Sequence, residues 1–439
     1  MTGGPDAPPE TMQVTGGRAL TGVLRVPGDK SISHRALLLA ALADGTSTIT
    51  GLSDGDDVRR TLAAIEALGA GVEEDAGTVT VHGGRARLRP PRSPIDLGNS
   101  GTGMRLLAGI VASLPGTTVL TGDASLQRRP MDRIAEPLGR MGASVVGRGE
   151  RCLPPIEVTG AALSGIEYTP PMASAQVKSA ILLAGLGAEG DTVVHEPVAT
   201  RNHTEEMLEA AGADITVART DAGWDIRVAR SELRPGSTAV PGDPSQAAFW
   251  VVGAVIVPGS QVTVDDVHLG AERIGFIHVL LRMGALIDLE RDGHGGGQVT
   301  CRAGRLHGTV VRADEIPSLD EVPILAVAAA VADGETRFLE VGELRVKESD
   351  RLAGTVDLVN ALGGSARVDN DDLVVVGHGG PLRPGHVDAR GDHRMAMAAA
   401  IAGTACRSTS DVTTIAGWES VATSYPSFIT DLRTLTGAW

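Results

Sequence analysis

Apolar and polar positions follow one plan that recurs six times along the chain. Each copy begins with a polar or glycine-rich stretch and continues into an Ala- and Leu-rich run that predicts a buried helix. A glycine turn and a Thr- and Val-rich strand follow. The six copies are residues 28–52, 98–122, 172–196, 242–267, 318–341 and 391–417. A pattern repeated at a near-constant period predicts six equivalent structural units.

A second, more amphipathic helix is predicted after each copy, and each of these helices ends at a glycine. Glycine just past a helix is the usual helix-stop signal. In the first five units the chain then enters an apparent hairpin, for example residues 71–83 and 366–379. Each unit is therefore predicted to be β-α-β-α-β-β, an α/β class. The stop glycines, spaced by roughly 70 to 80 residues, are Gly69, Gly142, Gly212, Gly284, Gly363 and Gly437.

The repeat also predicts how the chain divides into domains. With 439 residues the chain is too long for one ordinary core. The opening of the fourth unit, VPGDPSQAA, echoes the opening of the first, VPGDKSISH. We therefore expect two domains of three units each, residues 29–240 and a discontinuous domain of residues 1–28 and 241–439. The sixth unit has no hairpin, and we expect the strand-like segment Met12–Val26 to complete it.

Composition excludes several classes of protein. The net charge of −15 argues against a general polyanion binder, and 2% aromatic residues are too few for base stacking, so no nucleic acid partner is expected. Residues 322–332, among the most apolar runs, have about half the ~20 residues that span a bilayer, so no membrane partner is expected.

Residues 1–12 have no basic or apolar signal-peptide region and are expected to form a disordered tail. Three widely spaced cysteines, which fit neither a disulfide framework nor a zinc site, favour a cytoplasmic location. They are Cys152, Cys301 and Cys406.

Lysine is scarce in this chain, which has 36 Arg and three Lys, namely Lys30, Lys178 and Lys347. A base composition that favours arginine codons explains the ratio, but a compact ammonium has properties that a guanidinium lacks. Lys178, four residues after Ser174, is expected to be a helix-side residue rather than a ligand.

Cationic and polar side chains recur at the predicted helix starts. If the units are equivalent, these starts converge on the gap between the domains. Backbone N–H groups at a helix N-terminus bind anions, whereas unpaired cations there oppose the helix dipole by about 0.3–1 kcal/mol each. The arrangement is favourable when small, multiply charged anions bind. The residues include Lys30, Ser31, Arg35, Asn99, Gly101, Thr102, Arg128, Arg129, Ser174, Gln176, Arg201, Asp320, Lys347, Glu348, Arg351, His393 and Arg394.

Each of these features also has a structural interpretation. GDKS at residues 28–31 lacks the spacing of a nucleotide P-loop. Asp320 is placed where a helix N-cap would lie, and Glu348 and Arg351 are spaced for an i,i+3 pair on a solvated helix face. The segment DHRM at 392–395 is also typical of a capped helix with exposed charges. Recurrence at one structural position favours the functional interpretation.

Eight motifs in the same order resemble those of the 5-enolpyruvylshikimate-3-phosphate synthases, over about residue 12 to the C-terminus. They are PGDKSISHRALLLAALADG, LGNSGTGMRLL, RRPM, SAQVKSAILLAGL, TRNHTEEML, LDEVPILAVAAA, ELRVKESDRL and GDHRMAMA. The resemblance implies a two-domain inside-out α/β barrel whose domains close over a cleft through a double hinge. It also implies transfer of the carboxyvinyl group of phosphoenolpyruvate to the 5-hydroxyl of shikimate 3-phosphate, with phosphate release through a tetrahedral intermediate and without metal or cofactor.

The resemblance also implies roles for individual residues. Asp320 is expected to be the base on the 5-hydroxyl, Glu348 to exchange a proton with the methylene carbon, and Lys30 to contact both substrates. Residues expected to bind shikimate 3-phosphate are Lys30, Ser31, Arg35, Ser174, Ala175, Gln176, Arg201, Asp320 and Lys347. Residues expected around phosphoenolpyruvate are Lys30, Asn99, Gly101, Thr102, Arg129, Gln176, Arg351 and Arg394.

Two positions depart from patterns in the family. Thr423 stands where some relatives carry a substrate-binding lysine, and Leu106 stands where many plant and enteric relatives have proline. Leu106 suggests reduced sensitivity to the inhibitor glyphosate, whereas Gly101 keeps the smaller residue of sensitive forms. We expect a monomer, and we expect His34 to pack outside the site. The alternatives are the sister transferase that acts on UDP-N-acetylglucosamine and a non-catalytic phosphometabolite-binding repeat protein.

Overall fold

The computed structural model describes residues 9–293 and 295–438, and residues 1–8 of the predicted tail lie outside this range. The chain divides into two compact units. Unit 1 contains residues up to Pro27 together with Pro241–Trp439, and unit 2 is Gly28–Val240. Among the described residues, no helix is both long and apolar enough to cross a membrane.

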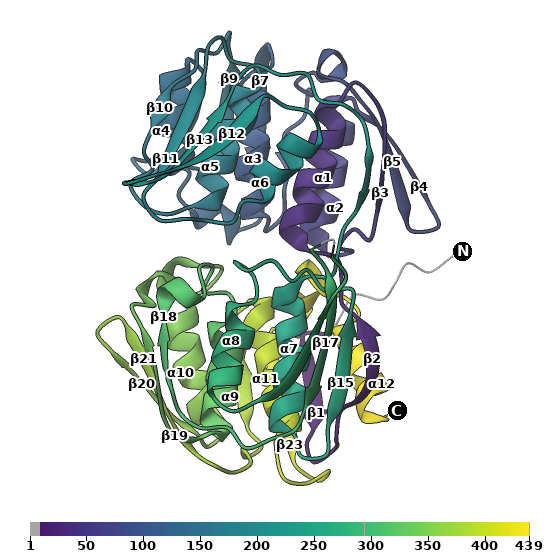
Figure 1. Cartoon of the computed structure of the whole chain (residues 1–439), viewed down its shortest axis with the longest axis vertical. Helices are drawn as coiled ribbons and strands as arrows, with labels where there is room; N and C mark the ends of the chain where they lie inside the picture. Colours follow the sequence, from purple (N-terminus) through teal and green to yellow (C-terminus); the bar gives the residue numbers. More distant parts are fainter. Residues whose placement is uncertain (1–8, 294, 439) are drawn as a thin grey trace. The chain divides into compact units, whose positions relative to one another are not determined.

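Unit 2 alternates helices and strands in the predicted order (Figure 1). Its elements are α1 (Lys30–Leu42), β3 (Gly45–Thr50), α2 (Asp56–Leu68), β4 (Gly71–Asp75), β5 (Thr78–Gly83), β6 (Ile95–Asp96), α3 (Gly101–Val111), β7 (Gly116–Thr121), α4 (Asp132–Met141), β8 (Ser144–Arg148), β9 (Leu153–Gly160), β10 (Glu167–Tyr168), α5 (Ala175–Gly185), β11 (Thr192–Glu196), α6 (His203–Ala210), β12 (Ile215–Thr220), β13 (Gly223–Val228) and β14 (Ser237–Ala239).

Unit 1 repeats the same alternation. Its elements are β1 (Thr11–Thr15), β2 (Thr21–Arg25), α7 (Pro244–Ile256), β15 (Gln261–Asp265), α8 (Gly275–Arg282), β16 (Leu286–Arg291), β17 (Gly297–Arg302), β18 (Val310–Arg312), α9 (Val322–Val331), β19 (Asp333–Leu339), α10 (Arg351–Ala361), β20 (Ser365–Asp369), β21 (Asp372–His378), β22 (His386–Asp388), α11 (His393–Thr404), β23 (Val412–Ala416) and α12 (Phe428–Thr436).

Each repeat forms its own small sheet, and the described residues form six such sheets. In the second repeat, for example, β6 runs parallel to β7, β7 pairs antiparallel with β9, and β9 pairs antiparallel with β8. The repeats built on β11 and β19 have the same pattern. The equivalence of the six units and the α/β class are therefore confirmed.

The N-terminal segment is shared between two repeats, so one prediction is wrong in part. β1 pairs antiparallel with β23 and completes the sixth repeat, as expected. β2, however, runs parallel to β15 and is the first strand of the fourth repeat. In the same way, β14 runs parallel to β3 and supplies the corresponding strand of the first repeat. The composition of Met12–Val26 could not show that a turn near Gly17 sends its two strands to different sheets.

The first helix of each repeat lies inside its unit, with strands on the outer sides (Figure 1). Every residue of α7 and α11 is buried, and α1, α3, α5 and α9 are buried over nearly their whole length. A helix buried on all sides has no polar face, which explains the Ala- and Leu-rich runs. The amphipathic second helices, such as α4, bury one face only. The ends of the inner helices are therefore the places where polar side chains gather.

Candidate active site

The α1 cations are paired within unit 2, which explains how they are tolerated at a helix N-terminus. Asp29 caps α1, and its carboxylate accepts a hydrogen bond of 3.0 Å from the backbone N–H of Ile32. Nζ of Lys30 lies 2.8 Å from Oδ2 of Asp57, in the first turn of α2. Both side chains are largely buried, so the pair is shielded from bulk water. The acidic residue thus offsets the unfavourable helix dipole at Lys30.

Arg35 links three helices of unit 2 and is itself buried, with 3% of its surface exposed. Its Nε donates to Oγ1 of Thr204 and its Nη2 donates to Oγ of Ser179, both at 2.6 Å. Nη1 of Arg201 donates to Oγ of Ser31 at 3.1 Å, which joins the segment before α6 to the start of α1. The predicted residues Ser31, Arg35 and Arg201 therefore lie together.

The starts of α3 and α5 are joined through the amide of Gln176. Oε1 of Gln176 accepts a hydrogen bond of 2.6 Å from Nη1 of Arg105, and its Nε2 donates to Oγ1 of Thr102 at 3.0 Å. Arg105 thereby fixes which side of the amide faces Thr102. Ser174 caps α5 by accepting a hydrogen bond from the N–H of Val177. Ala175 is the first residue of that helix.

Arg129 and Asn99 form a second link at the start of α3. Nη2 of Arg129 donates to Oδ1 of Asn99, and Nδ2 of Asn99 donates to Asp123 at 2.7 Å. Gly101 leaves room for both arginines of this region. A Cβ at position 101 would lie 3.0 Å from Nη1 of Arg105 and 3.1 Å from Nη1 of Arg129.

His34 is fully buried beneath the start of α3. Its Nδ1 lies 2.8 Å from Oγ1 of Thr61, and its Nε2 lies 3.4 Å from Oγ of Ser100, the N-cap of α3. Burial, with the positive charges of Lys30 and Arg35, lowers the pKa of His34 to about 3. His34 is therefore a neutral part of the support of this region.

In unit 1, one guanidinium gathers three carboxylates. Arg351, the first residue of α10, has 1% of its side chain exposed. It lies 2.9 Å from Asp320, 2.7 Å from Glu348 and 2.8 Å from Asp392. Burial alone would lower the pKa of Arg351, but the charges of the three carboxylates raise it above its ordinary value. Arg351 is a fixed positive charge, and both predicted catalytic carboxylates contact it.

Asp320 is not a helix cap. The N-cap of α9 is Glu321, and its side chain makes no capping bond. Oδ2 of Asp320 instead lies 3.5 Å from Nη2 of Arg394, a residue with 5% of its surface exposed. Nη1 of Arg394 is buried and has no hydrogen-bond partner among the described residues. A buried guanidinium N–H directed at no acceptor is a donor that an anionic ligand can satisfy.

The remaining predicted residues of unit 1 lie at the edges of this group. Nζ of Lys347 lies 3.2 Å from Glu343, with 22% of the lysine side chain exposed. Thr423 donates to the carbonyl oxygen of Ser420 at 2.7 Å, and its Oγ1 lies 3.1 Å from Nδ1 of His393. Thr423 is therefore part of a local hydrogen-bond network. It brings no cation to this position.

Comparison with known proteins agrees with the motif order. Residues 14–432 match the model of the family described as EPSP synthase (3-phosphoshikimate 1-carboxyvinyltransferase). A 3-phosphoshikimate 1-carboxyvinyltransferase of Gluconobacter oxydans is 46% identical over 431 residues, 96% of each chain. One of Desulforudis audaxviator is 47% identical over 433 residues, 97% of this chain and 99% of the relative. The chain belongs to the EPSP synthase family.

Solved EPSP synthases share the fold as well. A structure of the enzyme from Acinetobacter baumannii has a TM-score of 0.84 and 40% identity, and the match covers 97% of this chain and 98% of that chain. The two-domain enolpyruvyl transferase fold expected from the motifs is thus confirmed. The reaction is the carboxyvinyl transfer to 3-phosphoshikimate for which the family is named, so the UDP-N-acetylglucosamine and non-catalytic alternatives are not supported.

Several residues that contact the predicted site residues of this EPSP synthase were not predicted as partners. They are Asp57, which pairs with Lys30, and Arg105, which orients Gln176. Asp392 was placed at a helix start, where it caps α11, but its pairing with Arg351 was not predicted. Asp57 and Asp392 stand in the first turn or at the cap of a helix, where a carboxylate has an ordinary structural explanation. Arg105 stands two residues after Gly103 in the quoted GMRLL motif. Its long side chain and planar guanidinium, which can donate several hydrogen bonds, were the features of the sequence that could have indicated a partner such as Gln176.

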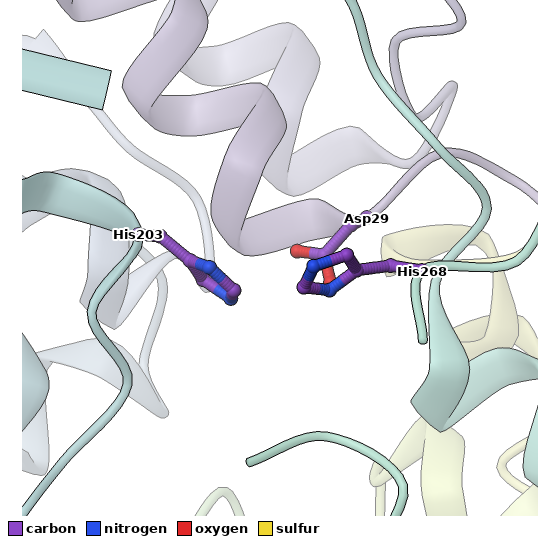
Figure 2. A group of neighbouring side chains, drawn as sticks. All are labelled: Asp29, His203 and His268. Atoms are coloured by element: carbon purple, nitrogen blue, oxygen red, sulfur yellow. The ribbon is translucent and has the colours of Figure 1, made fainter. Parts of the chain in front are cut away.

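Asp29 and His203 lie close together at two helix starts of unit 2. A ligand atom of Asp29 lies within 4.8 Å of one of His203, and both residues are buried (Figure 2). His268, also labelled there, belongs to unit 1. His203 is the first residue of α6 and follows Arg201 closely. The imidazole therefore lies near Asp29, the cap of α1.

Proposed function

We propose that the side-chain groups of the two units form one active site, closed between domains of residues 29–240 and of residues 1–28 with 241–439. Unit 2 supplies most of the cations and hydroxyl groups, and unit 1 supplies the carboxylates with Arg351 and Arg394. The observation that carries the proposed chemistry is that Asp320 and Glu348, both in unit 1, contact the buried guanidinium of Arg351. A base and a proton donor are thereby fixed beside one permanent positive charge.

Shikimate 3-phosphate is proposed to bind first to unit 2. The hydroxyl of Ser31 and the guanidinium of Arg201 are already in contact, and Ser174 and Ala175 begin α5. Backbone N–H groups at a helix start and charged donors together suit a phosphate and a carboxylate. The proposed set is Lys30, Ser31, Arg35, Ser174, Ala175, Gln176, Arg201, Asp320 and Lys347.

Phosphoenolpyruvate is proposed to contact both units. Arg129 and Asn99 lie beside Gly101 in unit 2. In unit 1, Arg394 has a buried donor with no hydrogen-bond partner among the described residues. Arginine forks bind carboxylate and phosphate in two-point fashion, whereas the compact ammonium of Lys30 can serve both substrates. The proposed set is Lys30, Asn99, Gly101, Thr102, Arg129, Gln176, Arg351 and Arg394.

The proposed chemistry needs two proton transfers. Asp320 takes the proton of the 5-hydroxyl as its oxygen attacks C2 of phosphoenolpyruvate, and Glu348 delivers a proton to the methylene carbon. Removal of that methylene proton then expels phosphate from the tetrahedral intermediate and restores the double bond. Arg394 contacts Asp320 as well, so the two carboxylates have different charged neighbours. Different surroundings are how two carboxylates acquire different proton affinities.

Phosphate release is the direct assay of this assignment. Purified protein is incubated with phosphoenolpyruvate plus shikimate 3-phosphate, with each alone, and with phosphoenolpyruvate plus UDP-N-acetylglucosamine. We expect release only when shikimate 3-phosphate and phosphoenolpyruvate are both present. Turnover with UDP-N-acetylglucosamine and none with shikimate 3-phosphate would contradict the assignment.

Domain closure is a second part of the proposal. The chain crosses between the units twice, near Gly28 and near Pro241, and these two crossings are the proposed double hinge. Closure would exclude water from the reacting atoms. Small-angle scattering should show a smaller radius of gyration when shikimate 3-phosphate is added. Superimposable curves with and without ligand would count against closure.

Glyphosate is proposed to compete weakly for the phosphoenolpyruvate site. Leu106, in place of proline, is fully buried in α3 next to Arg105, where it influences the helix that carries Gly101 and Thr102. The inhibition constant against phosphoenolpyruvate tests this, and a value equal to that of sensitive relatives would refute reduced sensitivity. We further propose that the enzyme is a cytoplasmic monomer, which sedimentation and cell fractionation can check.

A further inference from the structure

A buried ion-pair cluster lies one helical turn behind the proposed shikimate 3-phosphate site. Nζ of Lys178, in α5, lies 2.8 Å from Oε2 of Glu196 and 2.6 Å from Oε1 of Glu205. Glu196 ends β11, and Glu205 lies in the first turn of α6. The side chain of Lys178 is 1% exposed and those of both glutamates are 5% exposed. Three charged groups are thus removed from water at the junction of three elements.

This cluster carries an energetic cost that a purely structural junction would avoid. Buried ion pairs are often no more stabilising than apolar residues of the same volume. Oε2 of Glu205 is buried with no hydrogen-bond partner among the described residues, and burial raises the pKa of this carboxyl. One lysine faces two carboxylates, so the charges do not balance when both are ionised. Such a costly arrangement suggests a task besides filling space.

The cluster reaches the site through Thr200. Oγ1 of Thr200 donates to Oε1 of Glu196 at 2.5 Å, and the next residue, Arg201, donates to Ser31. The segment between β11 and α6 begins with exposed residues, including Val198 with 61% of its surface exposed. A segment with so little apolar anchoring depends on polar contacts to keep one conformation.

A parallel set of contacts fixes the neighbouring residues. Ser179 follows Lys178 and Thr204 precedes Glu205, and their hydroxyl oxygens lie 2.6 Å apart while both accept from Arg35. The helices α5 and α6 are therefore joined by a charged pair and a hydroxyl pair side by side. The charged pair continues, through Glu196 and Thr200, to the segment that carries Arg201.

We propose that Lys178 is a positioning residue for shikimate 3-phosphate, acting through Glu196 and Thr200 to hold Arg201 in its binding position. The lysine fixes the Glu196 carboxylate, the carboxylate holds the Thr200 hydroxyl, and the backbone carries that constraint to Arg201. The inference rests on the proposed role of Arg201 in binding shikimate 3-phosphate. It makes Lys178 neither a ligand nor a catalytic group.

The variant Thr200→Val tests the link without touching the buried charges. Valine has nearly the shape of threonine but cannot donate to Glu196. We expect the Kd for shikimate 3-phosphate, measured by calorimetry, to rise at least fivefold. The KM for phosphoenolpyruvate at saturating shikimate 3-phosphate and kcat should stay within twofold. Thr192→Val, at the start of β11, is the matched control because its buried hydroxyl has no partner among the described residues. It should leave all three values unchanged.

Arg201→Gln separates failure of this inference from failure of the proposed site. If Arg201→Gln leaves the Kd unchanged, the proposed binding role of Arg201 is wrong. If Arg201→Gln weakens binding and Thr200→Val does not, only the positioning role is wrong. The double variant should bind no more weakly than Arg201→Gln alone, since both changes act through one side chain. If the increases in Kd caused by the two single changes multiply in the double variant, the inference is overturned.

Lys178→Met tests the lysine itself. It leaves two carboxylates without their cation, and such a change commonly costs stability. Its folding is therefore checked by thermal melting before binding is measured. A folded Lys178→Met protein should lose at least as much shikimate 3-phosphate affinity as Thr200→Val, with kcat changed less. Wild-type affinity in that protein would overturn the inference. If the variant does not fold, Thr200→Val and the double variant decide.

Discussion

Asp320 and Arg351 are joined by an ion pair of 2.9 Å in which the arginine is buried and the aspartate is partly exposed. The buried partner keeps its charge, whereas the exposed carboxylate can still meet a ligand. One charge of the pair is therefore held away from water while the other stays accessible. It is the geometry that a base needs if it must exchange a proton with substrate.

Asp320→Asn should therefore lower turnover strongly and preserve binding. The amide can still accept from Arg351 but cannot take a proton, so kcat should fall at least about a hundredfold, the usual contribution of general base catalysis. The Kd for shikimate 3-phosphate should change by less than about fivefold. Asp288→Asn, whose side chain is 65% exposed, is the matched control. Near wild-type kcat in Asp320→Asn would remove Asp320 from the base role.

Gly101→Ala should weaken phosphoenolpyruvate binding selectively. The added Cβ would lie 3.0 Å from Arg105 and 3.1 Å from Arg129, closer than ordinary contact. The arginines must shift, so we expect the KM for phosphoenolpyruvate to rise roughly tenfold or more, about 1.4 kcal/mol, while shikimate 3-phosphate binding changes little. Gly139→Ala, in an open position of α4, is the control. Equal KM values for the wild-type and Gly101→Ala enzymes would show that these arginines do not hold phosphoenolpyruvate.

Arg105→Met should impair binding of both substrates through Gln176. Without its 2.6 Å partner, the amide of Gln176 can rotate and present the wrong atom to Thr102 and to substrate. We expect steady-state KM values to rise about tenfold, roughly 1.4 kcal/mol, with a smaller effect on kcat. Arg59→Met removes an exposed arginine of the same unit and should be neutral. Unchanged KM values in Arg105→Met would mean that Gln176 is held by other contacts.

His34 should make the folded protein sensitive to acid. Its pKa is about 3 when folded and near 6.5 when unfolded, so the unfolded chain binds more protons between these values. The stability present above pH 6.5 therefore falls as the pH drops toward 3, by up to about 1.4 kcal/mol per pH unit. His34→Gln should show a shallower decline in urea titrations, whereas exposed His378→Gln should follow the wild type. Parallel curves for wild type and His34→Gln would contradict this prediction.

The sequence was sufficient to predict the repeat because its signals are local. Each stop glycine closes a helix, as Gly69 and Gly142 do with left-handed backbone angles. The partition of Met12–Val26 between two sheets was not predictable because strand partners are chosen by packing between distant segments. The residues of β1 and β2 are both compatible with a strand, but they do not indicate which sheet each strand joins.

The site was predicted mainly through its motifs, and its supporting residues were not. Asp320 taken alone was compatible with an N-cap, and only the structure shows Arg351 and Arg394 beside it. Lys178 was expected on the side of a helix, yet it is buried between two glutamates. Sequence spacing reports neighbours on one element, whereas these pairs join side chains brought together from different helices and strands.

The pairing of β1 with β23 has a consequence for the order in which the protein forms as it is synthesised. Unit 2 has all its strands once Ala239 has been made, because β14 completes the sheet begun by β3. The sheets of unit 1 cannot be completed until later, because Thr11 pairs with Ala416 and β2 pairs with β15. Its first strands therefore remain without partners through most of translation, with unpaired edges that other chains can bind. The N-terminal strands, which lie far in sequence from their partners, are therefore the part of unit 1 that stays unpaired longest as the chain is made.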